Sequence, residues 1–400
     1  MAVERDPEPR IRGRNVPPRV RSALAYVVVF TAVGAYVPYL PLYYRSLGLG
    51  LGEIGAILAV GAFVGLVAAP LWGALSDRRR GSPWVLIGGI SVAILGAGTL
   101  ALSGALWTTF LGAALFGAGL AGTVPILDAR ALEAAGANRS SYGPLRAWGS
   151  MSYVVSAVGT GAAIETWGIR ALFVVVTAAL VATAVVGLSL RSPVRRSVDL
   201  VVNPLWNAGR LFGPRGLGLF LVGAFLSWLA MGSVLTFTPL RFAELGAGAT
   251  IVGLGGAIAA SIEAPIMLGF PKLAARFGSE RLLITGVVFI VARAVVAELA
   301  TEPTVLLAAS VFGGVAFALF FVGGVTYVSR RVPPELAATA QGIFQGLANS
   351  LSQVTAAFVG GAAAAAFGIQ GLFAVGIVLG MVGAVILAIA VRSKVGTTTR

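Results

Sequence analysis

The sequence predicts an all-α membrane protein whose twelve transmembrane helices form two six-helix repeats. Composition sets the class, because 58% of the 400 residues are hydrophobic, only 11% are charged, and the mean hydropathy is +0.92. Apolar runs of about 20 residues recur along the chain, and each can cross a hydrocarbon core of roughly 30 Å. Local matches between the two halves of the chain indicate that the helices arose by duplication.

The first half opens with a charged, proline-rich stretch, residues 1–20, that has no apolar core. We expect a solvated tail here rather than a signal peptide. The N-terminal six-helix bundle is predicted over residues 21–190, with helices at about 22–46, 51–75, 83–103, 106–133, 141–165 and 169–190. The 54 glycines of the chain suit helices that pack closely within a membrane.

A polar segment, residues 191–215, separates the two bundles and carries five arginines. We interpret it as the linker between the repeats. The C-terminal six-helix bundle is predicted over residues 216–392, with helices at about 217–240, 250–275, 280–300, 304–330, 336–366 and 370–391. A short tail, residues 393–400, completes the chain.

Two local matches support the duplication. Pro70 in APLWGALSDRRRGS corresponds to Pro271 in GFPKLAARFGSE, 201 residues later. The pattern Gly143-x-x-Arg146 corresponds to Gly342-x-x-Gln345, 199 residues later. Because both offsets are close to half the length of the chain, we expect two parallel six-helix repeats around a central site.

The net charge of +14 is distributed as in a membrane protein rather than in a nucleic-acid-binding protein. Most of the 29 Lys and Arg residues fall in the termini and in every second loop. The alternate loops contain only Arg45, Arg170 and Arg241. This asymmetry follows the positive-inside rule and predicts that both termini are cytoplasmic.

An acid and a base lie inside the fourth and fifth predicted helices. Asp128 and Arg146 are equally distant in sequence from the turn between these helices, so both should lie at about the same depth, roughly 13 Å from it. One charge near a helix centre costs about 2.5–3.5 kcal/mol on insertion scales, so two such charges are not expected in helices that serve only to span lipid. The pair therefore indicates a polar interior that lines a path. A static ion pair that fixes helix register is the alternative to a polar interior that lines a path.

A second acid and base repeat this arrangement in the other half. Glu263 in the eighth helix and Arg293 in the ninth lie equally far from their turn, at about 22 Å. They can pair with each other or with helices that are not adjacent in sequence. We favour function over a static bridge because buried ion pairs stabilise poorly compared with apolar replacements.

Several polar and aromatic residues are candidates for contacting a solute, although each also suits core packing or hydrogen bonding between helices. Three share one helix face by their i, i+4, i+8 spacing: Gln345, Asn349 and Gln353. The aromatic candidates are Tyr36, Tyr39, Trp148 and Tyr153. The turn GALSDRRRG, with Gly73, Asp77 and Arg78, is a topogenic positive cluster or a gating hinge in which Asp77 changes partners.

The sequence also disfavours several classes. It contains no cysteine and no histidine, which removes thiolate metal sites, disulfides and the commonest proton carrier at neutral pH. It contains no metal-ligand cluster, no phosphate-binding loop and no nucleophile–histidine pair. We therefore expect neither an enzyme nor an ATP-driven pump, and no metal or cofactor.

Over nearly its whole length the chain resembles the major facilitator superfamily. The turn GALSDRRRG resembles that superfamily's signature between helices 2 and 3, but the usual basic residue after the turn glycine is missing. The stretches GAYVPYLPLYYRSLGLGLGEIGAIL, VPILDARAL and YGPLRAWGS resemble the branch of phenylpropionate permease-like and nucleoside symporter-like proteins, with the lactose permease more distant.

The resemblance implies roles for particular residues. It implies that Asp128 and Arg146 form a charge pair bordering the solute cavity, and that Tyr153 stacks on the solute. It implies that Arg293 belongs to the proton-translocating group, with Glu263 one helical turn from an essential acid. The family's histidine and acid of helix 10 are missing from residues 311–327, so a carboxylate must carry any coupled proton.

These observations favour a secondary active transporter that moves a small organic solute by alternating access, in symport with protons. The solute would be an organic or aromatic acid, a sugar or a nucleoside. A drug or metabolite exporter working as a proton antiporter, an uncoupled facilitator and a passive channel are the alternatives. Proton carriage is expected of Glu263 or Asp128, with Arg293 as partner. We expect a monomer in a prokaryotic plasma membrane, with solute, protons and lipid as its partners and no nucleic acid.

Overall fold

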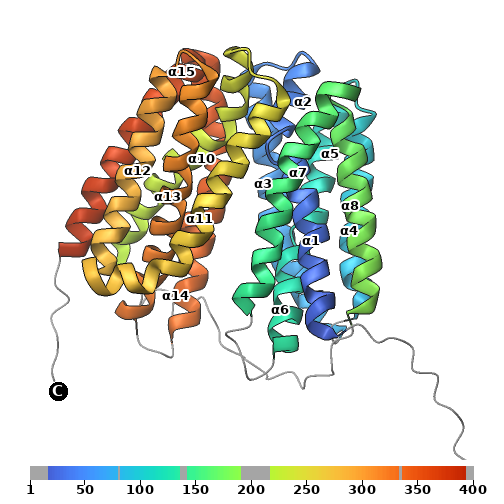
Figure 1. Ribbon diagram of the computed structural model, residues 1–400, viewed down its shortest axis with the longest axis horizontal. Coiled ribbons are helices and arrows are strands. Elements are labelled where there is room, and N and C mark those ends of the chain that lie inside the picture. Colours follow the sequence, from blue (N-terminus) through green and yellow to red (C-terminus); the bar gives the residue numbers. More distant parts are fainter. Residues whose placement is uncertain (1–16, 80–81, 136–141, 191–216, 333–335, 393–400) are drawn as a thin grey trace, which may run out of the picture.

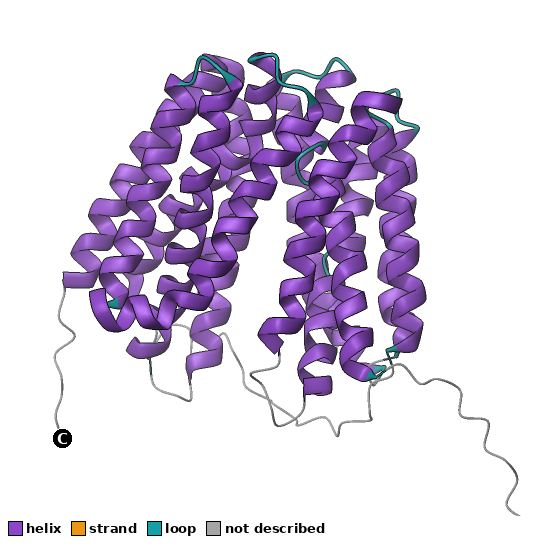
Figure 2. Cartoon of the chain, in the orientation of Figure 1, coloured by secondary structure: helices purple, strands orange, loops and turns teal. Residues whose placement is uncertain are grey.

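The computed structural model describes residues 17–79, 82–135, 142–190, 217–332 and 336–392 (Figure 1). The predicted linker and C-terminal tail lie outside these residues, as does nearly all of the N-terminal tail. Within the described part the chain forms only helices and the loops that connect them (Figure 2). The all-α prediction is confirmed.

The N-terminal bundle follows the predicted helices, with two interruptions. Pro38 and Pro41 lack a backbone donor, and the first predicted helix accordingly ends at Tyr36 and resumes at Leu40. A second break falls at residues 121–122, where Trp72 packs directly on Gly122. The helices are α1 (Pro18–Tyr36), α2 (Leu40–Ser46), α3 (Leu51–Arg78), α4 (Pro83–Ala101), α5 (Leu106–Leu120), α6 (Thr123–Ala135), α7 (Tyr142–Trp167) and α8 (Ala171–Ser189).

The C-terminal bundle is more continuous, and its longest element bends. Gly368 has φ 74°, a left-handed conformation that glycine adopts without penalty, and it turns the chain inside α15. This bend separates the last two predicted crossings. The elements are α10 (Leu217–Glu244), α11 (Ala249–Phe277), α12 (Ser279–Leu299), α13 (Pro303–Arg331), α14 (Ala337–Ile343), the π-helix η3 (Phe344–Leu351) and α15 (Ser352–Arg392).

The described helices agree with twelve crossings. Ten are long and apolar enough to span a membrane, and the last of these, Thr339–Arg392, is 54 residues long. It contains the bend at Gly368 and so accounts for two crossings. The 26-residue helix α7 supplies a further one.

Turn glycines repeat between the halves, as duplication predicts. Gly48 and Gly246 both have positive φ and lie 198 residues apart. Gly168 and Gly368 also have positive φ and lie 200 residues apart. A left-handed turn that needs glycine has therefore been kept at matching places in both repeats.

The two bundles meet at one end of the molecule. We call the end where α1 begins and α15 finishes the terminal end, and the end with the turns at Gly48, Gly168, Gly246 and Gly368 the opposite end. In Figure 1 the ribbons of the two bundles converge toward the opposite end and diverge toward the terminal end.

Glycines make the contacts between the bundles. In the α3–α15 seam, a Cβ on Gly361 would lie 2.6 Å from the Cα of Gly55. In the α7–α11 seam, a Cβ on Gly161 would lie 2.6 Å from the carbonyl oxygen of Ala249. A real Cβ does not approach so closely, so glycine is what lets these backbones touch near the opposite end.

Exposed tryptophans mark the levels at which a membrane would meet the N-terminal bundle. Trp84, at the terminal end of α4, is 70% exposed. Trp107 and Trp167, at the opposite end, are 80% and 78% exposed. Tryptophan prefers the membrane–water interface, and the apolar helix surface between these levels suits contact with lipid.

Candidate functional site

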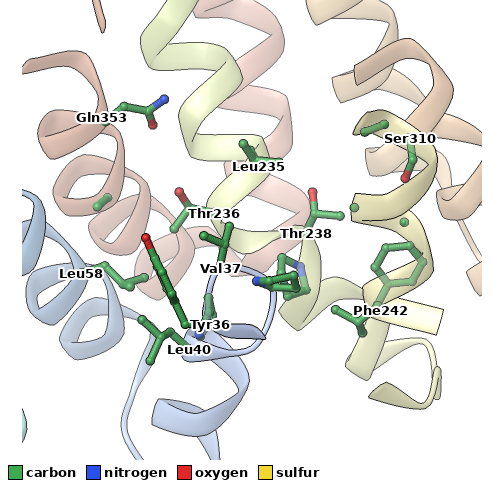
Figure 3. A pocket seen from close by; sticks show the side chains of 18 of the residues that line it. Tyr36, Val37, Leu40, Leu58, Leu235, Thr236, Thr238, Phe242, Ser310 and Gln353 are labelled. Atoms are coloured by element: carbon green, nitrogen blue, oxygen red, sulfur yellow. The ribbon is translucent and has the colours of Figure 1, made fainter. Parts of the chain in front are cut away.

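A cavity of about 280 Å³ lies between the two bundles, just on the terminal side of the seams. Both halves of the chain line it. Figure 3 shows Tyr36 and Leu58 from the N-terminal bundle and Thr238 and Phe242 from the C-terminal bundle around the same space. The polar and charged side chains in its wall are Tyr36, Tyr153, Thr236, Thr238, Arg293, Ser310 and Gln353.

Prolines shape the wall on both sides. The break after Tyr36, at Pro38, brings the end of α1 and the start of α2 to the cavity. Pro239 interrupts hydrogen bonding inside α10, and the hydroxyl of the preceding Thr238 donates to the Val234 carbonyl at 2.5 Å. Both interruptions lie at the level of the cavity, because Pro38 and Pro239 are among its lining residues.

A second cavity, of about 370 Å³, adjoins the first and belongs to the N-terminal bundle alone. The two share Tyr36, Leu40, Leu58 and Ala62 as lining residues. Its other walls are small or apolar, and Phe116 meets the Tyr36 ring edge-on at 5.0 Å between centroids. The site thus extends from polar groups between the bundles into an apolar space beside α5.

Two charged residues of the C-terminal bundle are Arg293, which lines the cavity, and Glu263, which lies within electrostatic range of the lining residue Tyr153. Arg293 is on α12, and only 7% of this residue is exposed. Glu263 on α11 interacts electrostatically with Arg146 on α7 of the other bundle. Tyr153 is within electrostatic range of both Glu263 and Arg293. The interaction of the acid on α11 thus reaches across the two halves.

Tyr26 connects the predicted pair of charges in the N-terminal bundle. Its hydroxyl donates to the Asp128 carboxylate at 2.5 Å. The Arg146 guanidinium lies 5.8 Å from the centre of the same ring and 3.9 Å from the centre of the Phe30 ring. The phenol and the cation–π contacts therefore hold these two charges beside α1.

The structure brings together four of the predicted site residues, because Tyr36, Tyr153, Gln353 and Arg293 all line the cavity. Tyr39 does not. It is fully buried, and its hydroxyl donates to the Ala157 carbonyl and, at 3.2 Å, to the Ala249 carbonyl, where it ties the bundles together.

Other predicted residues lie away from the cavity wall. Trp148 is 50% exposed and does not line the cavity. Gln345 is half-buried in η3, whose wider turn replaces the α-helical spacing on which the predicted polar face depended. The side chain of Asn349 lies outside the described residues.

The predicted gating turn lies at the far end of α3. Asp77 and Arg78 are exposed in its last turn, and Gly73 is half-buried one turn earlier. Residues 80–81 of the turn lie outside the described part. These residues are at the terminal end, remote from the seams.

Several lining residues escaped the sequence analysis, notably Thr236, Thr238, Phe242 and Ser310. For Phe242 the internal repeat offered a sequence signal, because it aligns this residue with an aromatic residue of the first half. Pro41 precedes Gly48 by seven residues, as Pro239 precedes Gly246, so the repeat places Phe242 where Tyr44 stands in the first half. A single serine in an apolar helix, such as Ser310, gives no comparable signal.

The site has the chemistry of solute binding. Among the residues that the structure describes, no group of three or more acids or histidines could hold a metal ion. Hydroxyl, amide and guanidinium groups set among apolar side chains are typical of a small-molecule pocket.

Comparison with known proteins shows the family to which the chain belongs. The model of the MFS_1 like family matches residues 20–375. The maltose permease of Geobacillus stearothermophilus is 27% identical over 342 residues, covering 84% of this chain and 86% of that protein. The multi-drug resistance efflux pump PmrA of Streptococcus pneumoniae is 25% identical over 360 residues, covering 86% and 88% respectively.

A solved structure has the same fold. The crystal structure of the nucleoside transporter NupG matches with a TM-score of 0.82 and 16% sequence identity. The match covers 95% of this chain and 100% of that one.

The family match and the relatives show that the chain is a multi-pass membrane transporter and not an enzyme. The chain belongs to the MFS_1 like family, within the major facilitator superfamily.

Proposed function

We propose that this transporter moves a small organic solute by alternating access, in symport with protons. The observation that carries the proposal is the position of the cavity between two bundles that touch through glycine seams at the opposite end. If the seams part while the terminal ends of the bundles approach each other, the same cavity faces the other side of the membrane. Such rocking needs no chemical step in the protein.

Coupling is assigned to Glu263, with Asp128 and Arg293 as the other candidates for the proton path. Glu263 interacts with Arg146 across the two halves, so its charge acts on how the bundles approach each other. Protonation of Glu263 would remove this attraction and change the balance between the two orientations. Asp128, bound to Tyr26 inside one bundle, suits positioning of Arg146 instead.

The coupling proposal is tested with proteoliposomes and a panel of labelled solutes that contains maltose, uridine and phenylacetate. A solute that accumulates only under an inward proton gradient, and leaves when a protonophore is added, supports symport. Glu263→Gln mimics the protonated acid, so accumulation should be lost while exchange of internal for external solute persists. Accumulation by Glu263→Gln equal to that of the wild type would refute the assignment.

An exporter is the second candidate. The relatives include the efflux pump PmrA, and much of the cavity wall is apolar, as binding of a lipophilic drug requires. An exporter would release solute from loaded vesicles when protons enter, so the direction of the pH effect separates the two functions.

The turn after α3 is proposed as a gate at the terminal end, formed by Gly73, Asp77 and Arg78. Asp77 is exposed in the described structure, so it is available to pair when the terminal ends approach. Asp77→Asn should slow uptake several-fold and leave solute affinity unchanged, because the residue lies far from the cavity. Equal losses of affinity and uptake rate would contradict this role.

We also propose a plasma-membrane location with both termini in the cytoplasm, as the arginine distribution predicts. Thr301 is exposed at the opposite end, and the native chain has no cysteine. Thr301→Cys should react with an impermeant maleimide added to intact cells. Reaction only after the cells are opened would reverse the proposed orientation.

A further inference from the structure

We propose that Arg293 is the docking group for an anionic solute, so that the substrate class is a small organic carboxylate with an apolar body. This inference rests on the proposed transport function and names the solute chemistry of the same cavity. Arg293 lies in α12, is only 7% exposed, and contributes to the cavity wall. Its charge is therefore directed at the space that a solute occupies.

The other buried arginines have protein partners. Arg241 contacts the Glu244 carboxylate at 3.1 Å and donates to the Ala300 carbonyl at 2.8 Å. Arg130 donates to the carbonyls of Leu190 and Ser82. Each of these guanidinium groups is held by oxygen atoms of its own bundle, which offsets the cost of burial.

Arg293 differs from them. No acidic side chain among the described residues forms an ion pair with Arg293, and no described residue accepts a hydrogen bond from it. The Arg293 nitrogens are not sealed off inside the protein, because this residue lines the cavity, so a bound anion can accept their hydrogen bonds. The nearby Glu263 does not fill this role, because its electrostatic partner is Arg146 in the other bundle. Arg293 is therefore the charged residue that lines the cavity, and no carboxylate of the described residues lies within ion-pair distance of it.

The neighbouring helix α13 has a glycine, Gly313, where the Arg293 guanidinium packs against it. A Cβ on Gly313 would lie 2.5 Å from Nη1 of Arg293, so the guanidinium packs directly on the backbone of α13 at this glycine. Ser310, one turn earlier on α13, and Tyr153, across on α7, add hydroxyl groups to the cavity wall. A planar guanidinium with hydroxyl donors nearby matches the two oxygens of a carboxylate.

The remaining walls specify the body of the solute. Leu58, Leu235 and Phe242 are apolar, and Tyr36 leads into the second, mostly apolar cavity. The other polar lining residues are Thr236, Thr238 and Gln353. The Thr238 hydroxyl already donates to the Val234 carbonyl, so few groups remain for the many hydroxyls of a sugar. An aromatic or aliphatic chain attached to one carboxylate fits this division into a charged end and an apolar end.

The test compares acids with their neutral amides on the purified full-length protein. Benzoate, phenylacetate and hexanoate are titrated against benzamide, phenylacetamide and hexanamide by calorimetry and thermal shift. We expect at least one acid to bind about tenfold or more tightly than its amide, since a charged hydrogen bond adds roughly 1.5–3 kcal/mol. Arg293→Gln should abolish the preference, and Arg293→Lys should retain part of it.

Matched controls keep the result interpretable. Arg241→Gln removes another buried arginine, which contacts Glu244 and Ala300 and does not line the cavity, and should leave the preference unchanged. Equal binding of acid and amide, failure of all three acids to bind, or a preference that survives Arg293→Gln would each overturn the proposal. Thermal unfolding of each variant without ligand shows whether it is folded.

Transport measurements separate this inference from the proposed function. Binding of an acid through Arg293 without any transport would leave the anion site standing and refute the transport proposal. Proton-driven accumulation of a neutral sugar that is unchanged in Arg293→Gln would support transport and refute the anion site.

Discussion

The two seams between the bundles are equivalent by duplication, yet they are built differently. Gly55 and Gly361 of the α3–α15 seam match Gly253 and Gly161 of the α7–α11 seam, at offsets of 198 and 200 residues. Among the residues that the structure describes, hydrogen bonds across a seam are found only between α7 and α11 and from Tyr39 beside them. The Glu165 carboxylate accepts the backbone N–H of Thr250 at 2.9 Å and its hydroxyl at 2.8 Å. Tyr39 adds its bonds to Ala157 and Ala249.

The matching positions explain the asymmetry. In the α3–α15 seam, Ala365 stands where Glu165 stands, and Gly52 stands where Thr250 stands. These two meet by an ordinary contact, with the Ala365 Cβ 3.6 Å from a Cβ built on Gly52. No hydrogen bond joins α3 to α15 among their described residues. One seam therefore depends on shape alone, whereas the other also has a polar latch at the N-terminus of α11.

The largest effect should follow from filling the seam that depends on shape. Gly361→Leu inserts a side chain where backbones touch, and overpacking of about 2 kcal/mol would lower the closed population roughly 30-fold. Ala259→Cys, in the cavity, should then react much faster with an impermeant reagent added at the opposite end. Gly98→Leu is the control, because a Cβ there meets open space. Unchanged labelling would show that this seam is not tight.

Tyr39→Phe should have an intermediate effect on the other seam. It removes the donor to two carbonyls on different bundles, and an unsatisfied buried group costs about 1–3 kcal/mol. We expect a lower Tm and faster labelling of Ala259→Cys. Tyr43→Phe is the matched control, because that buried hydroxyl donates to the Leu100 carbonyl within one bundle. It should lower Tm without changing labelling, and equal labelling in both variants would contradict the role of Tyr39.

The smallest effect should come from Glu165→Gln, because this carboxylate is solvent-exposed. Loss of the charge at the α11 N-terminus should raise labelling of Ala259→Cys about threefold at low salt and less at high salt. Glu53→Gln, which alters a cap within α3 itself, should leave labelling unchanged. The paired change Gly52→Thr with Ala365→Glu should slow labelling by adding a latch to the other seam. An effect that does not depend on salt, or no effect, would show that the Glu165 carboxylate does not help to close this seam.

The sequence was sufficient for the bundle and for part of the site. Apolar runs located the helices because each must span the same hydrocarbon thickness. Glu263 and Arg293 were found because an acid and a base lie at equal distances from one helix turn. The sequence could not identify the electrostatic partner of Glu263, because Glu263 and Arg146 come near each other only when the two bundles are placed side by side. The glycine seams were hidden for another reason. With 54 glycines in the chain, composition cannot indicate which four touch across the bundles.

Local backbone departures explain why some of the predicted residues do not line the cavity. The predicted polar face through Gln345, Asn349 and Gln353 assumed regular α-helical spacing, but η3 changes the rotation per residue. Tyr39 was predicted as a solute contact from its depth alone. The break at Pro38 turns its ring into the seam, a direction that helical periodicity does not supply.

The uneven placement of tryptophan has a mechanical consequence. Trp84, Trp107 and Trp167 fix both interfacial levels of the N-terminal bundle, whereas Trp228, the tryptophan described in the C-terminal bundle, is fully buried. We therefore expect the first bundle to stay anchored in the headgroups while the second tilts against it. For each of Trp84, Trp107 and Trp167, fluorescence quenching by spin-labelled lipids should report the same depth with and without bound solute. A shift in those depths would show that the anchored bundle also moves.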